Sequence, residues 1–350
     1  MPQSAVDSVS PALEHAKTQL FRPFRLGQWS RLALVGLFAG EMSSGGGCNN
    51  FQVPSHAGGG HQELLSAFPY PWLFGPLLVV LVIAVPLLWL VFLYLSSRMR
   101  FILFDSVVAK RCEIGLMWRR RGEPAMRYFV WQIVLSLVSL AGMALIIGVP
   151  ALIAFSLGWF TEPRNHLAGL ISVGLFVFFA FMGWVLLALL THVFTKDFVV
   201  PQMALENISA FEGWSRLWRM LQNEKAGYAG YAGMKLLLAI AAGIAIGIVA
   251  IILLVILLIP IGGLGAITVL GGQAAGLSWN VFTITLAVVA GCIFLLVFFY
   301  AVALISVPAI VFFPAYSIYF FAGRYPHLGS LIYPAPPLAP PPLPVPQPAP

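Results

Sequence analysis

The sequence predicts an all-α integral membrane protein, and two observations carry that prediction. Hydrophobic residues make up 60% of the 350 residues and charged residues only 9%, whereas soluble globular domains carry roughly a quarter charged residues. Several apolar runs also reach the about 20 residues that a helix needs to cross a bilayer. Because lipid offers no partner to a backbone N–H or C=O group, each of these runs must be helical.

Five runs are long enough to cross, and their central parts contain no Asp, Glu, Lys, Arg or His. An ionisable side chain at mid-membrane is costly, so centres without charge are typical of crossings. The predicted crossings lie near residues 77–97, 128–155, 167–191, 236–260 and 281–305.

A sixth crossing is predicted near residues 28–42, although its apolar centre is short. If it crosses, 18 of the 19 Lys and Arg residues lie on one side and only Arg164 on the other. If it does not, the next helix must carry the basic segment 98–127 outward, against the positive-inside rule. The sequence therefore predicts one six-helix transmembrane domain over residues 1–330, with both termini in the cytoplasm.

The net charge of +7 points to lipid as the partner of the cytoplasmic face. Anionic headgroups attract each Lys or Arg near the surface by about 1 kcal/mol, and the chain contains no nucleic-acid-binding motif. No cofactor is predicted. No cleavable signal is predicted either, because the first apolar run begins some 30 residues into the chain.

Three Trp-x-Arg pairs, 89 and then 96 residues apart, each precede an outward crossing: Trp29 with Arg31, Trp118 with Arg120, and Trp214 with Arg216. Trp prefers the headgroup level and Arg extends to phosphates, so the pairs are predicted to be membrane-interface anchors. The spacing predicts three hairpin repeats, near residues 12–100, 101–198 and 199–305, each led by a cytoplasmic amphipathic elbow helix. A break at Pro308 is expected to begin a fourth elbow.

The elbow of the third repeat shows the clearest amphipathic pattern. Its apolar face recurs at three- and four-residue steps and includes Ile208, Phe211, Trp218 and Leu221. Such a helix lies in the membrane interface. Two interpretations stay open: these helices shape the turns between crossings, or they recruit lipid or a partner protein.

The stretch "FVVPQMALENISAFEGWSRLWRML", with Pro201, Glu206, Trp214 and Leu217, resembles the recurrent element of a large group of bacterial multi-pass proteins. That group includes the membrane domain attached to some glycerophosphoryl diester phosphodiesterases. The match is mainly over residues 192–260. The resemblance implies a six-helix protein of the bacterial inner membrane, and it does not imply phosphodiesterase activity, because that activity belongs to a separate soluble barrel.

The crossings carry no residue suited to catalysis or proton transfer at mid-depth, which argues against an intramembrane hydrolase and a proton-coupled transporter. Polar residues such as Gln132 and Ser139 are interpreted as interhelical contacts. The glycine-rich external loop 43–72 contains His56, His61, Cys48 and Glu63. Their spacing is irregular, so a solvated loop is favoured over a metal site, and the prediction is a non-enzyme without a metal.

Two further segments suggest contacts. Ala239, Gly243 and Gly247 form a stripe of small residues that permits close helix packing, within the monomer or in a dimer. Residues 331–350 form a proline-rich tail that adopts extended polyproline II structure. The tail is a spacer or a docking ligand for a partner.

Two functional hypotheses follow. The first is a non-catalytic membrane protein that organises lipid or a membrane protein assembly through its basic elbows. The alternative is a channel or transporter for an apolar or lipid-like solute, which requires a continuous cavity between the hairpins.

Overall fold

The computed structural model describes residues 4–41, 74–160, 163–274 and 281–333. These residues form helices and short connections, and no strand occurs among them. The helices are α1 (Val9–Phe21), α2 (Leu26–Phe38), α4 (Phe74–Val108), α5 (Ile114–Arg120), α6 (Gly122–Ser156), η2 (Pro163–His166), α7 (Leu167–Phe194), η3 (Thr195–Val199), α8 (Val200–Glu206), α9 (Ala210–Asn223), α10 (Lys225–Ala274), α11 (Val281–Ala322) and α12 (Pro326–Ile332).

Five helical stretches in the described part of the chain are long and apolar enough to cross a membrane. They coincide with the five long crossings that the sequence predicts. Their bounds are Val82–Val108, Gly122–Ser156, Arg164–Glu206, Lys225–Ile259 and Thr283–Ala322. The protein is therefore a helical membrane protein.

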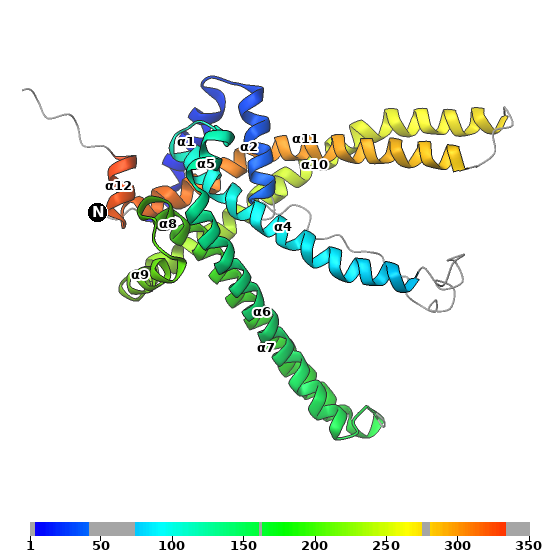
Figure 1. The fold of residues 1–350 in the computed structure, drawn as a ribbon, viewed down its shortest axis with the longest axis horizontal. Helices are drawn as coiled ribbons and strands as arrows, with labels where there is room; N and C mark the ends of the chain where they lie inside the picture. Colours follow the sequence, from blue (N-terminus) through cyan, green and yellow to red (C-terminus); the bar gives the residue numbers. More distant parts are fainter. Residues whose placement is uncertain (1–3, 42–73, 161–162, 275–280, 334–350) are drawn as a thin grey trace, which may run out of the picture.

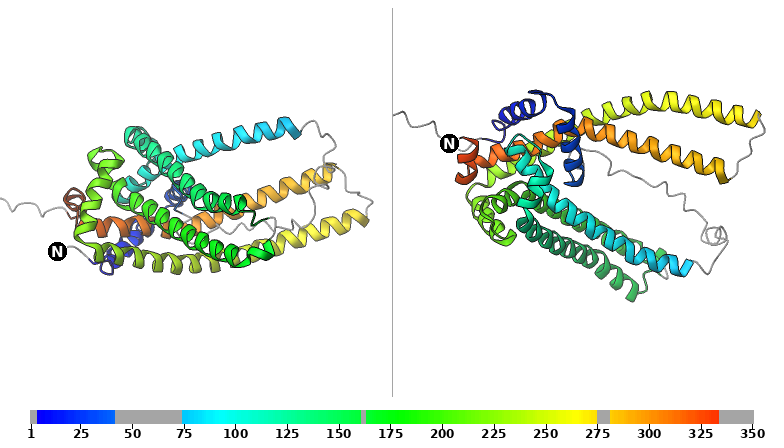
Figure 2. Two further views of the ribbon diagram at one scale, coloured as in Figure 1. Left: turned by 90° about the horizontal axis from the view of Figure 1, so that it is seen from below. Right: turned by 45° about the horizontal axis from the view of Figure 1, so that its top comes forward.

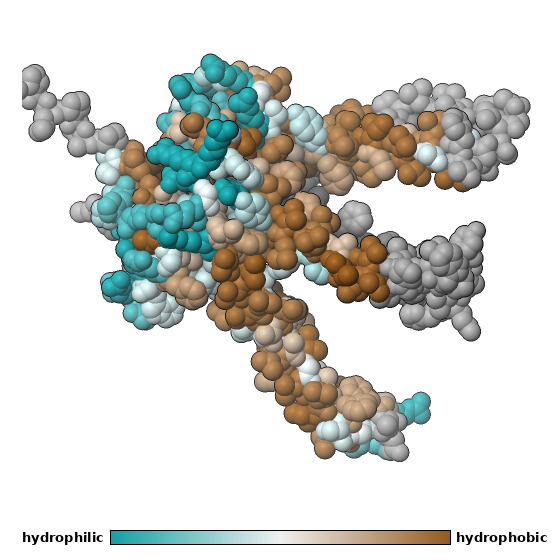
Figure 3. All heavy atoms as spheres, in the orientation of Figure 1, coloured by the Kyte–Doolittle hydropathy of each residue, from teal (hydrophilic) through white to brown (hydrophobic). Residues whose placement is uncertain are grey.

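The long helices leave a common base as three separate arms (Figures 1 and 2). We use "base" for α1, α2, α5, α8, α9 and α12 together with the adjoining ends of the long helices. The arms are α4, the antiparallel pair α6–α7 and the antiparallel pair α10–α11. Hydrophilic residues gather over the base, while the arms are covered by hydrophobic residues (Figure 3).

Burial is confined almost entirely to the base. In the most apolar window of each spanning stretch, at most 11% of the residues are buried. By contrast, the ends of α4 and α11 in the base and the segment 198–204 are buried nearly throughout. The described helices thus fold around a core in the base, and the arms present their apolar faces to their surroundings.

Close packing within an arm is clearest in the α6–α7 pair. The indole N–H of Trp184 in α7 donates a hydrogen bond to the Ser139 carbonyl of α6, at 3.1 Å. A Cβ atom at Gly142 would lie only 2.1 Å from the Trp184 ring. The absence of a side chain at Gly142 is what lets the two helices approach here.

The predicted first crossing near residues 28–42 is not found as a spanning helix in the described residues. Helix α2 ends at Phe38 and has 13 residues, which is about 20 Å and shorter than the about 30 Å hydrocarbon core. It packs on α11, where a Cβ at Gly36 would lie 2.5 Å from the Ile310 side chain. Glu41, just beyond α2, forms an ion pair with Arg100 at 2.7 Å, so it lies in the base.

The described ends of the chain both lie in the base, because α1 and α12 each contact α11 there. Helix α4, however, begins at the far end of its arm and runs back toward the base (Figure 1). Residues 42–73, between Glu41 in the base and Phe74 at the far end of the α4 arm, lie outside the described residues.

Two helices continue beyond their predicted ends. Helix α10 runs past Pro260 to Ala274, although residue 260 was the predicted limit. Helix α11 contains both Pro308 and Pro314, so the break predicted at Pro308 is wrong. The backbone bond lost at a helical proline costs about 3 kcal/mol, and here the fully buried Val307, Ile310 and Val311 provide compensating contacts.

Helix α1 and the residues before it contact α4 and the C-terminal part of α11. The His15 side chain on α1 contacts the Val107 carbonyl of α4 at 2.9 Å and the Tyr319 hydroxyl of α11 at 3.2 Å. The Tyr316 hydroxyl donates a hydrogen bond to the Ala5 carbonyl at 3.1 Å. Burial lowers the pKa of His15 below its ordinary value, so the imidazole is neutral at pH 7.

Candidate functional site

A basic cleft lies at the edge of the base, where the connection between α1 and α2 meets the turn that follows α4. The cleft has a volume of about 620 Å³. Five cationic side chains line it: Arg22, Arg25, Arg31, Lys110 and Arg111. One carboxylate, Glu113, and six neutral residues complete the lining: Thr18, Gln19, Pro23, Gly27, Gln28 and Cys112.

Hydrogen bonds from two glutamines hold the walls of the basic cleft together. Gln28 at the start of α2 donates to the Lys110 carbonyl at 3.3 Å and to the Gln19 carbonyl at 3.5 Å. Gln19 in turn donates to the Ser106 carbonyl at 3.0 Å. Lys110 has a φ of 55°, a left-handed conformation that ends α4 and turns the chain toward α5.

The cations of the basic cleft differ from most others in the base because no carboxylate of the described chain pairs with them. No described Asp or Glu lies within ion-pair distance of Arg22, Arg25, Arg31, Lys110 or Arg111. Elsewhere in the base, Arg121 pairs with Asp105 at 2.7 Å and Arg324 with Glu224 at 2.6 Å. The basic cleft therefore gathers five cations that form no ion pair with a described Asp or Glu, and positive charge is in excess there.

Exposed apolar side chains adjoin the cleft-lining residues in the sequence. Phe21, Phe24 and Leu26 are 54%, 54% and 65% exposed. The rings of Phe21 and Phe24 lie 5.7 and 5.4 Å from the Trp29 ring. Cationic and exposed aromatic groups side by side are typical of a surface at the headgroup level of a membrane.

An apolar groove of about 740 Å³ lies on the opposite face of α1, between α1, α10 and α11. Lys17 is the one charged residue among those that line it. The others are Leu13, Ala16, Leu20 and Phe21 of α1, Leu238, Ala241, Ala242, Ala245 and Ile246 of α10, and Ile305, Pro308, Ala309 and Phe312 of α11.

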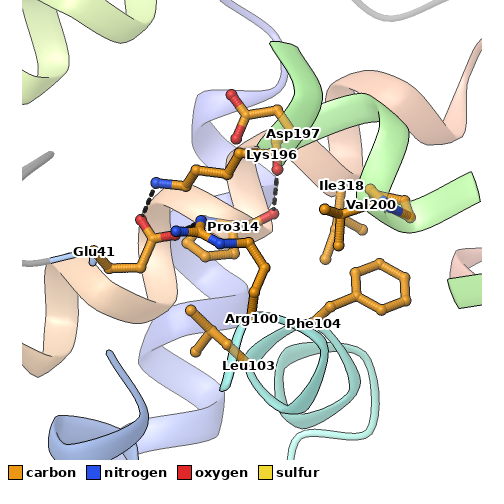
Figure 4. Close-up of a pocket in the computed structure, with 11 residues that line it drawn as sticks. Glu41, Arg100, Leu103, Phe104, Lys196, Asp197, Val200, Pro314 and Ile318 are labelled. Atoms are coloured by element: carbon orange, nitrogen blue, oxygen red, sulfur yellow. Dashed lines mark hydrogen bonds and ion pairs between the residues drawn. The ribbon is translucent and has the colours of Figure 1, made fainter. Parts of the chain in front are cut away.

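A buried ion network occupies the centre of the base (Figure 4). Glu41 accepts hydrogen bonds from Arg100, at 2.7 Å, and from Lys196. Asp197 accepts one from the Tyr231 hydroxyl at 2.9 Å and another from Lys235. A cavity of about 30 Å³ adjoins the network, which is room for little more than a water molecule.

The charges of this network depend on one another. Burial alone would raise the pKa of the Glu41 carboxyl, but Lys196 and Arg100 beside it outweigh burial and lower the pKa to about 2. Two carboxylates thus neutralise most of the charge of three buried cations. Since breaking such a pair leaves an uncompensated buried charge, the network stabilises the base, and its small cavity gives no room for an organic substrate.

The three predicted tryptophan anchors all pack against the core of the base. The indole N–H of Trp29 donates to the Leu20 carbonyl at 3.1 Å, and that of Trp214 to the Thr195 hydroxyl at 2.9 Å. The Trp118 ring lies 5.2 Å from the Arg98 guanidinium. These tryptophans therefore hold the short helices against the base.

The three predicted arginine anchors lie in different surroundings. Arg31 lines the basic cleft, and Arg120 is exposed on α5. Arg216 forms ion pairs with Glu206 at 2.5 Å and with Glu212 at 2.6 Å, so its charge is largely compensated.

The predicted apolar face of the third elbow is only partly available to a membrane. Ile208 and Leu221 pack against the core. Phe211 and Trp218 are 68% and 57% exposed, and the Phe211 ring contacts the Trp131 ring at 4.9 Å. Helix α9 thus packs one side against the core of the base and leaves the rings of Phe211 and Trp218 largely exposed.

The predicted packing stripe is half-buried at all three positions, Ala239, Gly243 and Gly247. A Cβ at Gly247 would meet no atom within 4 Å. Close packing of the described chain does not account for this glycine. Small residues one or two positions away on α10, Ala242 and Ala245 among them, line the apolar groove instead.

Sequence reasoning missed most of the basic cleft and the whole ion network. A usable signal for the network was Glu41. Between Glu14 and Asp105 the sequence has only two acidic residues, Glu41 and Glu63, and Glu63 lies in the predicted loop. A carboxylate beside an apolar helix needs a cation, and Arg100 and Lys196 each follow a long apolar run.

The described residues show no group of three or more His, Cys, Asp or Glu side chains able to hold a metal ion. The candidate ligands of loop 43–72 and residues 334–350 of the predicted tail 331–350 lie outside the described residues, while residues 331 and 332 belong to α12. Burial raises the pKa of the Cys112 thiol in the basic cleft, so this thiol is neutral at pH 7 and a poor nucleophile.

The model of a family of unknown function, DUF7544, matches residues 3–331. The chain belongs to this family. Comparisons with curated proteins and with solved structures give no significant match.

Proposed function

We propose that this protein is a non-enzymatic multi-pass protein of the bacterial inner membrane. It organises lipid, or a membrane protein assembly, through the cationic side chains of its base. In this proposal the base faces the cytoplasm. The positive-inside rule supports that orientation, because Arg164, at the turn between α6 and α7, is the one Lys or Arg at the far end of an arm.

The basic cleft is the observation that carries the proposal. It gathers five cations without an ion-pair partner in the described chain beside three exposed apolar side chains. Each cation near an anionic surface contributes about 1 kcal/mol of attraction. The arms next to the base are open to lipid on nearly all faces, so bound lipids have access from the bilayer.

The apolar groove favours a second candidate, the handling of a lipid-like solute. Two membrane-spanning helices and α1 line it, and small residues of α10 make room for a chain of methylene groups. A transport function would further need a path from this groove to the other side of the membrane.

Lipid enrichment tests the first proposal. The protein is reconstituted into nanodiscs containing phosphatidylcholine and phosphatidylglycerol, and the lipids that stay bound after extraction into mild detergent are quantified by mass spectrometry. Phosphatidylglycerol should be enriched over its share in the bilayer, and raising the salt from about 0.1 M to about 1 M should reduce the enrichment, because surface electrostatics are screened.

A variant localises the effect. Replacing the five cleft cations by Gln should remove most of the enrichment, whereas Arg119→Gln with Arg120→Gln on exposed α5 should remove less. Arg121 is unsuitable for this test, because its guanidinium is bonded to Asp105 inside the base. Equal lipid composition in the protein shell and the bulk would contradict the proposal.

A further inference from the structure

We propose that the basic cleft binds a ligand with two phosphate groups, and that this ligand is the headgroup of a diphosphate lipid of the cardiolipin class. The inference rests on the proposed function, since it names the lipid that the base would organise. The basic cleft and its surroundings support it in four ways.

Charge is the first. The basic cleft holds five cations and one carboxylate, Glu113, which leaves an excess of four positive charges. A single phosphodiester carries one negative charge and would leave most of that excess uncompensated. Two phosphates compensate more of it, and arginine binds each in a bidentate manner.

The arrangement of the cations is the second. Arg22 and Arg25 come from the connection between α1 and α2, Arg31 from α2 itself, and Lys110 with Arg111 from the turn after α4. The charges are thus distributed over three segments that meet only in the folded base. Such a distribution suits two separated anionic groups better than one.

The start of α2 is the third. Arg25 occupies the N-cap position, and its side chain makes no capping hydrogen bond. The first N–H groups of a helix carry partial positive charge and bind phosphate well. Gly27 in this first turn has open space where a Cβ would be, so a ligand can approach the backbone closely.

Size and position are the fourth. The volume of about 620 Å³ is within the range of small-molecule sites, whereas the cavity at the ion network holds about 30 Å³. The exposed Phe21, Phe24 and Leu26 directly precede or follow the cleft-lining Arg22 and Arg25 and would contact acyl chains. Exposed apolar side chains next to the cations favour a lipid headgroup over a soluble diphosphate.

The open position at Gly27 allows a sharp test. Gly27→Glu places a carboxylate in the basic cleft without a steric clash, and an acidic residue in the first turn of a helix is favourable. Gly115→Glu is the matched control, because Gly115 is also an exposed glycine in the first turn of a helix, α5, with nothing within 4 Å of its Cβ. Gly115 does not line the basic cleft.

Four proteins are compared: the wild type, the two glycine variants and the double variant Arg22→Gln/Arg111→Gln. Each is reconstituted with cardiolipin and twice its molar amount of phosphatidylglycerol, so that both lipids offer equal charge. Retained lipids are counted by native mass spectrometry. The wild type and Gly115→Glu should retain cardiolipin in preference by about tenfold, and the other two variants should lose most of that preference, as the loss of one to two cation contacts implies. Equal thermal midpoints check that the variants are folded.

The possible outcomes separate the proposals. Equal retention of the two lipids by the wild type overturns the inference and leaves the general lipid-organising function standing. If the wild type retains neither anionic lipid above its share in the bilayer, both the inference and the proposed function are overturned. In a second arm, pyrophosphate is titrated onto the detergent-solubilised protein; displacement of cardiolipin at micromolar pyrophosphate would show that the cleft takes a soluble diphosphate, and would overturn the assignment to lipid.

Discussion

The base and the arms of this protein both contain many apolar side chains, but they bury them to very different degrees. In the base, Phe198 is completely buried among the rings of Tyr228, Tyr231, Phe320 and Phe321. In the arms, at most 11% of the residues in each spanning window are buried. The buried core of the base therefore determines the fold, while lipid covers the arms.

The largest expected effect compares two phenylalanines on one continuous helical run. Phe198→Ala should lower the free energy of unfolding by about 3–5 kcal/mol, because it removes a fully buried ring. Phe178→Ala, in the α7 arm with 54% exposure, should change it by less than about 0.5 kcal/mol. Denaturant unfolding in detergent, followed by tryptophan fluorescence, measures both; similar losses would show that the arms contribute equally to stability.

Next in size is the loss of a buried charge. Glu41→Gln leaves Arg100 and Lys196 without their carboxylate and should cost about 3 kcal/mol. Glu14→Gln removes an exposed acid on α1 and should be nearly neutral. An equally small effect at both positions would mean that the network does not hold the base together.

The same carboxylate predicts a dependence on pH. The pKa of Glu41 falls from 4.5 to about 2 in the folded base, so its stabilisation is complete above pH 4.5 and is lost as the pH falls toward 2. At 1.36 kcal/mol per unit, this corresponds to about 3 kcal/mol. Thermal unfolding between pH 6 and 2 should show this loss in the wild type and a smaller loss in Glu41→Gln; parallel pH curves for the two proteins would contradict the assignment.

The smallest effect is local. The Ser209 hydroxyl accepts a hydrogen bond from the Glu212 amide at 3.2 Å and caps α9. Ser209→Ala should cost about 1 kcal/mol and speed hydrogen exchange in the first turn of α9. Ser215→Ala, exposed on the same helix, is the control, and unchanged exchange in the first variant would show that contact with the base, not the cap, holds the helix.

Much of the fold follows from the sequence, because length and hydropathy alone identify five crossings. The errors are at places where packing overrides local signals. Proline 308 is a helix breaker in sequence terms, yet α11 continues through it since the neighbouring residues are buried. The sixth crossing, predicted near residues 28–42 from charge asymmetry, is not among the five spanning stretches of the described residues, where α2 ends at Phe38 and packs on α11.

The candidate site was predictable only in part, because a sequence does not show which arginines are paired. Arg31 was identified from its Trp-x-Arg pair and does line the basic cleft. Arg216 has the same motif, but Glu206 and Glu212 compensate its charge. Arg22, Arg25 and Arg111 have no motif at all, and only the meeting of two distant turns brings them together.

The contacts of α1 have a consequence for how the chain is made. His15 and Ala5 bind Tyr319 and Tyr316, which are 304 and 311 residues later in the sequence. During synthesis, α1 emerges before α11. The contacts of α1 with α11 therefore form only after α11 has been synthesised, whereas the basic cleft is lined by residues between Thr18 and Glu113 and can assemble before them.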